Sequence, residues 1–310
     1  MAGNTTEKTE SANTDKNGEP CTGENCTEEK CAGCPTASSC SSAKTPGATG
    51  LPPKAKIDVK HVIMVLSGKG GVGKSTVSVN LAYALSNHGY NVGLLDLDMH
   101  GPNIPKMLGI EDHKLSAVGN MIEPVRVTGS LSVISMAFLL PDTSTPIIWR
   151  GPMKMSAIGQ FLNEVNWGSL DYLVVDLPPG TGDEALTIAQ LAPNMEGAVV
   201  VTTPQDVATL DSRKAVKFVE KLGMPVLGII ENMSGMVCPH CGEAIDLFGK
   251  GGGEKIAREL GVPFLGGIPI DVDMPKAGDE GRPFIIRRKQ SATWDAMDKV
   301  MEALVKVVEG

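Results

Sequence analysis

A glycine-rich segment at residues 68–76 constrains the fold of this chain more than any other feature. An apolar, β-branched run at 61–66 precedes it, and a helical pattern from Val77 to His88, which Gly89 can end, follows it. A strand, a glycine loop and a helix in this order predict a phosphate cradle, because backbone N–H groups and the helix N-terminus then face one point. The segment reads Gly68, Lys69, Gly70, Gly71, Val72, Gly73, Lys74, Ser75 and Thr76.

The polar side chains of this segment indicate which ligand the cradle holds. The P-loop pattern G-x-x-x-x-G-K-[ST] places Lys74 at the β- and γ-phosphates of a nucleotide and the Ser75 hydroxyl on Mg²⁺. A glycine turn that only joins a strand to a helix would leave both side chains unexplained. We therefore expect all nine residues, 68–76, to form an ATP site, with an additional lysine at Lys69.

Composition excludes several classes of protein. The net charge of −8 argues against a dedicated nucleic-acid surface. No run of eighteen apolar residues is present, so we expect no membrane span, and the N-terminus lacks the apolar core of a signal peptide. We therefore expect a cytoplasmic protein without nucleic-acid or membrane partners. The seven cysteines then indicate metal or redox chemistry rather than structural disulfides.

The first 55 residues differ in composition from the rest. Positions 2–50 contain no Val, Ile, Leu, Met, Phe, Trp or Tyr, so this part cannot bury enough apolar surface to offset its ordering entropy. We expect a disordered cysteine-rich tail and a Pro/Gly linker over 1–55, and one P-loop ATPase domain over 56–310.

The second part of the chain has the pattern of an α/β fold. Several apolar runs are too continuous for a half-exposed sheet, which favours a mostly parallel sheet with helices on both faces. The clearest helices are predicted at 206–222 and 291–308. Strands are predicted at 61–66, 92–97, 131–136, 172–177, 197–203, 225–231 and 264–269.

Two predicted strands end in carboxylates. Asp176 follows three apolar residues, the Walker B arrangement that holds Mg²⁺, and Gly180 in the next turn has no side chain to block a γ-phosphate. Asp98 is the candidate for orienting the attacking water, with Asp96 nearer the strand end. Aspartates at strand ends also cap loops, and we expect His100 to be an ordinary loop histidine.

Five segments together resemble the Mrp-type (ApbC/Mrp) family of deviant Walker P-loop ATPases, which are iron–sulfur cluster carriers and include the cytosolic nucleotide-binding scaffolds. The resemblance implies that Lys69 reaches the partner's phosphates in a nucleotide-sandwich homodimer. It also implies that Asn232, and residues near Pro269, contact the adenine. The segments are K-G-G-V-G-K-S-T (69–76), D-L-D-M-H-G-P-N (96–103), W-R-G-P-M-K (149–154), D-L-P-P-G-T-G-D (176–183) and E-N-M-S-G-M-x-C-P-x-C (231–241).

Cys238 and Cys241 form a C-x-x-C pair around His240, which we expect to point to solvent. Two thiolates can hold one side of a metal centre but cannot complete four-coordination. The spacing alone leaves three alternatives open: half of a zinc site, a redox dithiol, or half of a centre shared between two chains. The family resemblance favours the last, a labile 4Fe–4S cluster that bridges two subunits.

The tail contains a second set of cysteines. The C-x₂-C-x₅-C spacing of Cys31, Cys34 and Cys40 resembles the N-terminal cluster motif of the longer, cytosolic members of the family. Those members have a fourth cysteine further upstream, where this chain has Asn17. Cys21 or Cys26 could take its place, and the alternative is a disordered tail with adventitious thiols.

These observations give a hypothesis and two alternatives. The hypothesis is an ATP-binding, slowly hydrolysing homodimer that accepts an iron–sulfur cluster and passes it to apo-proteins. The first alternative is a MinD- or ParA-like positioning ATPase, which leaves the cysteine pair unexplained. The second is an electron-transfer ATPase that resembles the nitrogenase iron protein.

Overall fold

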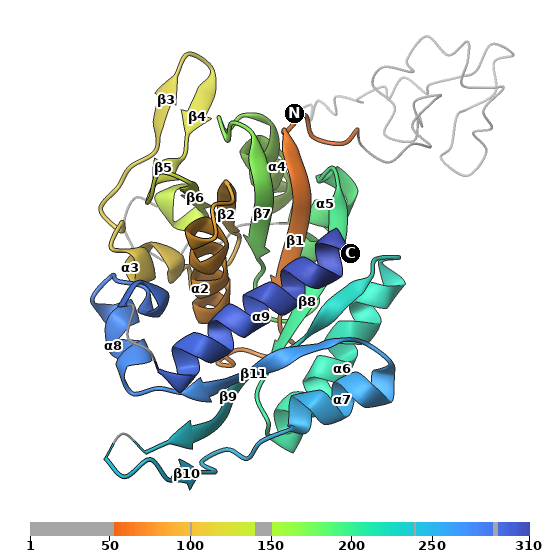
Figure 1. Cartoon of the computed structure of the whole chain (residues 1–310). Helices are drawn as coiled ribbons and strands as arrows, with labels where there is room; N and C mark the ends of the chain where they lie inside the picture. The colour runs from red at the N-terminus through yellow and green to blue at the C-terminus, as the bar shows by residue number, and fades with distance from the viewer. Residues whose placement is uncertain (1–52, 100, 140–150, 239, 288–290) are drawn as a thin grey trace, which may run out of the picture. The chain divides into compact units, whose positions relative to one another are not determined.

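A mostly parallel β-sheet forms the centre of the protein, as the apolar runs predict (Figure 1). The computed structural model describes residues 53–99, 101–139, 151–238, 240–287 and 291–310. The strand order is β10-β9-β8-β1-β7-β2-β6-β5, with β11 also paired to β9; only β10 and β5 run antiparallel to their neighbours. The strands are β1 (Val59–Leu66), β2 (Val92–Asp96), β5 (Val125–Arg126), β6 (Leu131–Ser135), β7 (Leu170–Asp176), β8 (Met195–Thr202), β9 (Val226–Val237), β10 (Ala244–Ile245) and β11 (Phe264–Ile270).

Helices cover both faces of this sheet. Along β1, Ile63 and Val65 belong to one apolar core, whereas Val62, Met64 and Leu66 belong to a second core on the other face. The first core includes residues of α2 and α9, and the second includes residues of α4, α5, α6 and α7. The helices are α2 (Lys74–Asn87), α3 (Ile104–Leu108), α4 (Gly151–Asn163), α5 (Asp183–Leu191), α6 (Asp206–Lys221), α7 (Gly252–Leu260), α8 (Asp273–Asp279) and α9 (Ala292–Glu309), with 3₁₀ turns η2 (Met136–Leu139) and η3 (Phe284–Arg287).

All seven predicted strands are present, with shifted ends. The largest shift is in β9, which continues to Val237 instead of ending at 231, and so leads directly into Cys238. Four short strands were not predicted: β5, β10 and the separate hairpin of β3 (Ser116–Val118) and β4 (Met121–Glu123). Each is only two or three residues long, too short to show a periodic pattern.

The predicted helix after the glycine segment begins earlier than its apolar pattern. Helix α2 starts at Lys74, directly after Gly73, whose φ of 80° lies in the left-handed region. Most of its residues are buried, because it packs against the sheet on one side and near α3 and α9 on others (Figure 1). None of the helices in the described ranges is long and apolar enough to cross a membrane.

Parallel strands place the predicted site residues together. The strands β1 and β2 flank β7 and all three run in the same direction, so the loops that follow them leave from one edge of the sheet. Binding sites of open α/β sheets lie at this edge.

Candidate nucleotide and cysteine sites

The carboxylate of Asp176 accepts hydrogen bonds from three side chains at the glycine-loop site. Its Oδ2 accepts hydrogen bonds from Lys74 Nζ and Ser75 Oγ, each at 2.7 Å, and its Oδ1 accepts from Ser78 Oγ at 2.6 Å. The side chain is fully buried, and these three donors satisfy both of its oxygens. Sequence reasoning missed Ser78, which lies one helical turn after Lys74 on the same side of α2.

Asp96 lies beside Asp176 on the neighbouring strand, since the two residues are register partners in the β2–β7 pairing. Burial, together with the charge of Asp176, raises the pKa of Asp96 well above its ordinary value. The Ser135 hydroxyl donates to Asp96 Oδ2 at 2.8 Å, and the Asp98 N–H donates to Oδ1 at 3.1 Å. Asp96 therefore supports the loop that carries Asp98.

A cavity of about 170 Å³ lies over the glycine loop. Asp98 lines this cavity, and its carboxylate accepts a hydrogen bond from the Gly101 N–H at 3.2 Å. A Cβ placed on Gly70 or Gly71 would meet no atom within 4 Å, so these two glycines face open space. Six of the nine predicted residues line the cavity: Gly70, Gly71, Gly73, Lys74, Ser75 and Thr76.

The other three residues of the glycine segment have different positions. Gly68 packs closely against α6, since a Cβ there would lie 2.2 Å from the carbonyl oxygen of Asp211. Val72 is buried in the apolar core. The Lys69 carbonyl accepts a hydrogen bond from Ser67 Oγ at 2.9 Å.

A second cavity of about 500 Å³ continues from the first, since Gly73, Thr76, Asn103 and Met107 line both. Its wall contains Asn232 and Pro269, the two positions that the resemblance implied for a base contact. Cavities of this size hold small ligands. A smaller, polar space at a helix N-terminus that opens into a larger, more apolar one fits the phosphates and the nucleoside of one nucleotide.

The β9 backbone is unusual where it forms this wall. Asn232 Nδ2 donates to the Val72 carbonyl at 2.9 Å, which ties the strand to the glycine loop. The next residue, Met233, has a φ of 59°, a left-handed conformation that a residue with a long side chain rarely adopts. Such strain concentrates at functional sites.

Gly180 lies in the turn after β7, beside the glycine loop. Its N–H donates to the Ser67 carbonyl at 2.9 Å, and its φ of 93° requires a residue without a side chain. The turn is therefore fixed to the start of the glycine loop, and no side chain projects from Gly180.

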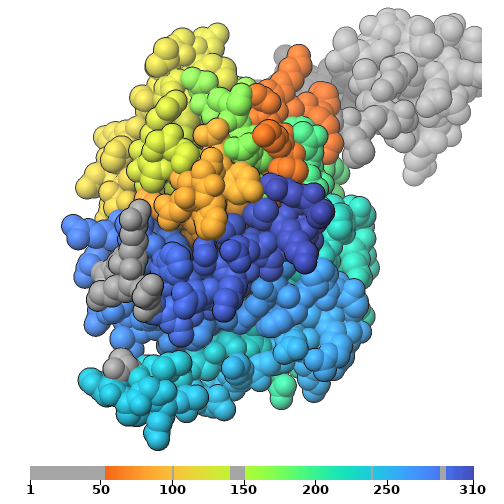
Figure 2. All heavy atoms as spheres, viewed as in Figure 1, coloured from red at the N-terminus to blue at the C-terminus, as the bar shows by residue number. Residues whose placement is uncertain are grey.

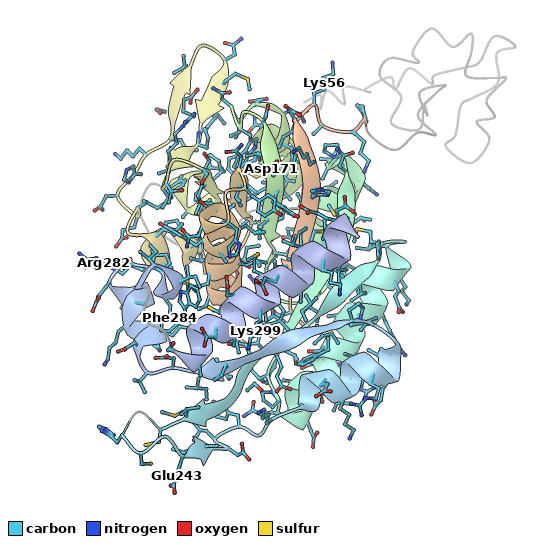
Figure 3. The ribbon with its side chains drawn as sticks, in the orientation of Figure 1. Lys56, Asp171, Glu243, Arg282, Phe284 and Lys299 are labelled. Carbon is cyan, nitrogen blue, oxygen red and sulfur yellow. The ribbon has the colours of Figure 1, made fainter. Side chains whose placement is uncertain are left out.

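The cysteine pair lies at the end of the antiparallel hairpin of β9 and β10. The Cys238 N–H donates to the Glu243 carbonyl, and the Gly242 N–H donates to the Cys238 carbonyl, each at 2.9 Å. Figure 3 shows Glu243 at the lower edge of the molecule, directly before β10. Cys238 is half-buried, and Cys241 is exposed, as is His240.

The loop geometry favours a thiolate at Cys238. Hydrogen bonds from the backbone N–H groups of Cys241 and His240, and from the Cys241 thiol, lower the pKa of the Cys238 thiol. Thiolates are the form that binds metals. Among the residues that the structure describes, no three His, Cys, Asp or Glu side chains are grouped so as to hold a metal ion, so the pair offers two ligands and not a complete set.

Some predicted residues lie outside the described residues. They are Cys21, Cys26, Cys31, Cys34 and Cys40 of the tail, His100, and the first two residues of the W-R-G-P-M-K segment.

Comparison with known proteins identifies the family of this chain. A family model described as NUBPL iron-transfer P-loop NTPase matches residues 58–305, a range that includes both the glycine loop and the cysteine hairpin. The chain belongs to this family. The P-loop NTPase fold predicted from the sequence is thereby confirmed, and so is the resemblance to the cluster carriers.

Close relatives have names that refer to iron–sulfur clusters. An iron-sulfur cluster carrier protein from Methanocaldococcus jannaschii is 52% identical over 252 residues, which are 81% of this chain and 86% of the relative. The cytosolic Fe-S cluster assembly factor CFD1 of Candida glabrata is 52% identical over 228 residues, 72% of this chain and 80% of the relative.

Solved structures support the fold. A nucleotide-binding protein from Archaeoglobus fulgidus, in complex with ADP, is 41% identical with a TM-score of 0.65, over 77% of this chain and 91% of that one. The cell division ATPase MinD of Pyrococcus furiosus is 22% identical with a TM-score of 0.56, over 80% of this chain and 99% of that one. The second similarity concerns the fold alone.

Proposed function

We propose that this protein is an ATP-dependent carrier that binds a labile 4Fe–4S cluster and transfers it to apo-proteins. The observation that carries the proposal is the cysteine hairpin: two accessible thiols, one with backbone N–H groups directed at its sulfur, and no further metal-binding group of three or more residues in the described ranges. A site that is exposed and half complete suits a ligand that is received and passed on. The names of the relatives support the same cargo.

A second copy of the chain would complete the ligand set. Two C-x-x-C pairs from facing subunits supply four thiolates, the usual number for a 4Fe–4S cluster. In this proposal Lys69 reaches the phosphates bound by the partner subunit. Its position outside the wall of its own subunit's phosphate cavity supports this role.

The glycine-loop site would bind ATP and hydrolyse it slowly. Backbone N–H groups of the loop and Lys74 hold the phosphates, and Ser75 with Asp176 would hold Mg²⁺, which neutralises charge on the phosphates. Asp98, which lines the cavity, would orient the attacking water molecule. Because Lys74 contacts Asp176 in the described structure, phosphate binding would exchange one anionic partner of Lys74 for another.

Transfer of the cluster would be an exchange of thiolate ligands. Each client thiolate replaces the thiolate of Cys238 or Cys241 on iron, and the released cysteine leaves with its electron pair, so neither partner is oxidised or reduced. Nucleotide binding and hydrolysis would change the geometry of the dimer and so the accessibility of the cluster.

The tail cysteines form the second part of the proposal. Cys31, Cys34 and Cys40, with either Cys21 or Cys26, would hold a separate centre within residues 1–55. Three or four thiolates within twenty residues can order a segment that has no apolar core of its own.

Anaerobic purification followed by iron, sulfide and zinc analysis tests the cargo. We expect about four iron and four sulfide per dimer at the hairpin, in addition to any iron of the tail. The variant Cys238→Ala should lose the hairpin fraction and keep the tail fraction. Zinc without sulfide in the wild type would refute the proposal for the hairpin.

Transfer to an apo-ferredoxin tests the role of the nucleotide. Lys74→Ala should bind the cluster but lose nucleotide-dependent transfer, because the phosphates lose their main cationic contact. Lys214→Ala, which removes an exposed lysine of α6 paired with Asp211, is the control and should transfer normally. Normal nucleotide-dependent transfer by Lys74→Ala would show that hydrolysis does not control cluster release.

A further inference from the structure

Two apolar residues on the segment that follows the cysteine hairpin are exposed without an evident reason. Leu247 is 57% exposed and Phe248 is 39% exposed. Both line the larger cavity, whose wall also contains Asn232 and Pro269. Exposed apolar side chains that face a cavity indicate that a ligand covers them.

The segment that carries these residues joins the cysteine hairpin at one end and helix α7 at the other. On one side, β10 pairs with β9 through Ala244 with Val237 and Ile245 with Met236, directly beside Cys238. Figure 2 shows this part of the chain, in cyan, at the lower edge of the molecule. The hairpin and residues 246–248 therefore form one continuous piece that touches both the cavity and the cysteines.

On the other side, the chain is clamped to the sheet. The buried carboxylate of Glu231 accepts hydrogen bonds from the N–H groups of Gly251 at 2.8 Å and Gly253 at 2.5 Å. Gly252 lies so close to Pro204 that a Cβ would be 2.2 Å from the Pro204 carbonyl oxygen. This end cannot shift without breaking these contacts, whereas the other end is an exposed hairpin with a two-residue edge strand.

We propose that Leu247 and Phe248 form an apolar subsite for the nucleoside of the bound nucleotide. When a nucleoside occupies this subsite, the two residues shift, and β10 passes the shift to Cys238 and Cys241. When the ligand displaces residues 247–248, they move toward the hairpin, because the hydrogen bonds of Glu231 fix the chain at Gly251 and Gly253. The inference rests on the proposed function for the identity of the ligand. It adds the route by which that ligand changes the cysteine site.

The first test measures the subsite by calorimetric titration of the cluster-free, full-length protein with ADP. Phe248→Ala should bind ADP about tenfold more weakly, and Leu247→Ala several-fold more weakly, because the nucleoside loses apolar contact area. Val118→Ala is the control. Val118 is 68% exposed on β3, so its truncation removes a similar apolar surface outside the cavity wall. Affinity within twofold of wild type in both cavity variants would overturn the subsite.

The second test measures transmission by the rate of iodoacetamide alkylation at the hairpin, with and without saturating ADP. Trypsin releases residues 222–250 as one peptide that contains Cys238 and Cys241 and none of the tail cysteines, so mass spectrometry reads this pair alone. We expect ADP to change the alkylation rate several-fold in the wild type and Val118→Ala. In Phe248→Ala, at ADP concentrations that saturate it, the change should be lost.

An ADP effect that is absent from the wild type, or unchanged in Phe248→Ala, would overturn the transmission. Failure of the proposed function gives a different result. A wild type that binds ADP and shows the alkylation change, but holds zinc and no sulfide, would refute the cluster cargo and leave the subsite and its route intact.

Discussion

Replacement of Glu231 by alanine should cost more stability than any comparable change at the surface. The side chain is 1% exposed, and its two oxygens accept from Ser234 Oγ at 2.5 Å and from the two N–H groups at the start of α7. Alanine leaves those N–H groups without an acceptor, one of them fully buried, while the Ser234 hydroxyl can rotate. At about 1–3 kcal/mol for each of the two unsatisfied N–H groups, we expect a loss of about 2–6 kcal/mol in the free energy of unfolding.

Urea titration followed by far-ultraviolet circular dichroism measures this loss. Glu231→Gln retains one acceptor oxygen but places an amide N–H₂ against a backbone N–H, so its loss should lie between wild type and alanine. The control is Glu254→Ala on α7, the helix whose first N–H groups Glu231 binds; the Glu254 carboxylate is 53% exposed and pairs with exposed Arg258. That change should cost less than about 1 kcal/mol.

The reasoning fails if Glu231→Ala and wild type have the same urea midpoint with the same m value. It also fails if Glu254→Ala is equally destabilised, because general weakening of α7, rather than the buried cap, would then explain both variants.

Two further predictions follow from single contacts. Gly73→Ala should lower the free energy of unfolding by about 1–3 kcal/mol, because its φ is 80° and its Cβ would lie 2.2 Å from Asn232 Nδ2; Gly70→Ala, whose Cβ would meet nothing within 4 Å, should leave it unchanged in the same urea titration. Tyr172→Phe should cost about 1–2 kcal/mol, since the hydroxyl donates to Glu309 Oε1 at 2.6 Å, while calorimetry should show unchanged ADP affinity because this contact joins β7 to the end of α9. A weaker ADP affinity in Tyr172→Phe would contradict that separation.

The sequence predicted the central strands and the phosphate cavity, because apolar runs and motifs of fixed spacing mark them. Apolar runs of five to eight residues revealed the central strands, and the glycine segment revealed the position of the cavity over Lys74 and Ser75. These signals are local, so one stretch of sequence is sufficient to read them.

Features that depend on contacts between distant segments could not be predicted. Ser78 is an ordinary polar residue of a helix until Asp176 of another strand is placed against it. Glu231 lies within a long strand, and only the fold brings α7 to its carboxylate. Leu247 and Phe248 have no periodic pattern, so their place in the cavity wall becomes visible only when β9, β11 and α8 surround the same space.

The alternation along β1 has a consequence for how this protein can change in evolution. Phe161 of α4 and Leu304 of α9 are both buried, but they belong to apolar cores on opposite faces of the sheet. Residues without shared neighbours contribute independently to stability. The sheet therefore acts as a partition: one side can accumulate substitutions and repack while the other keeps its side chains, and the loops at the strand ends remain in place throughout.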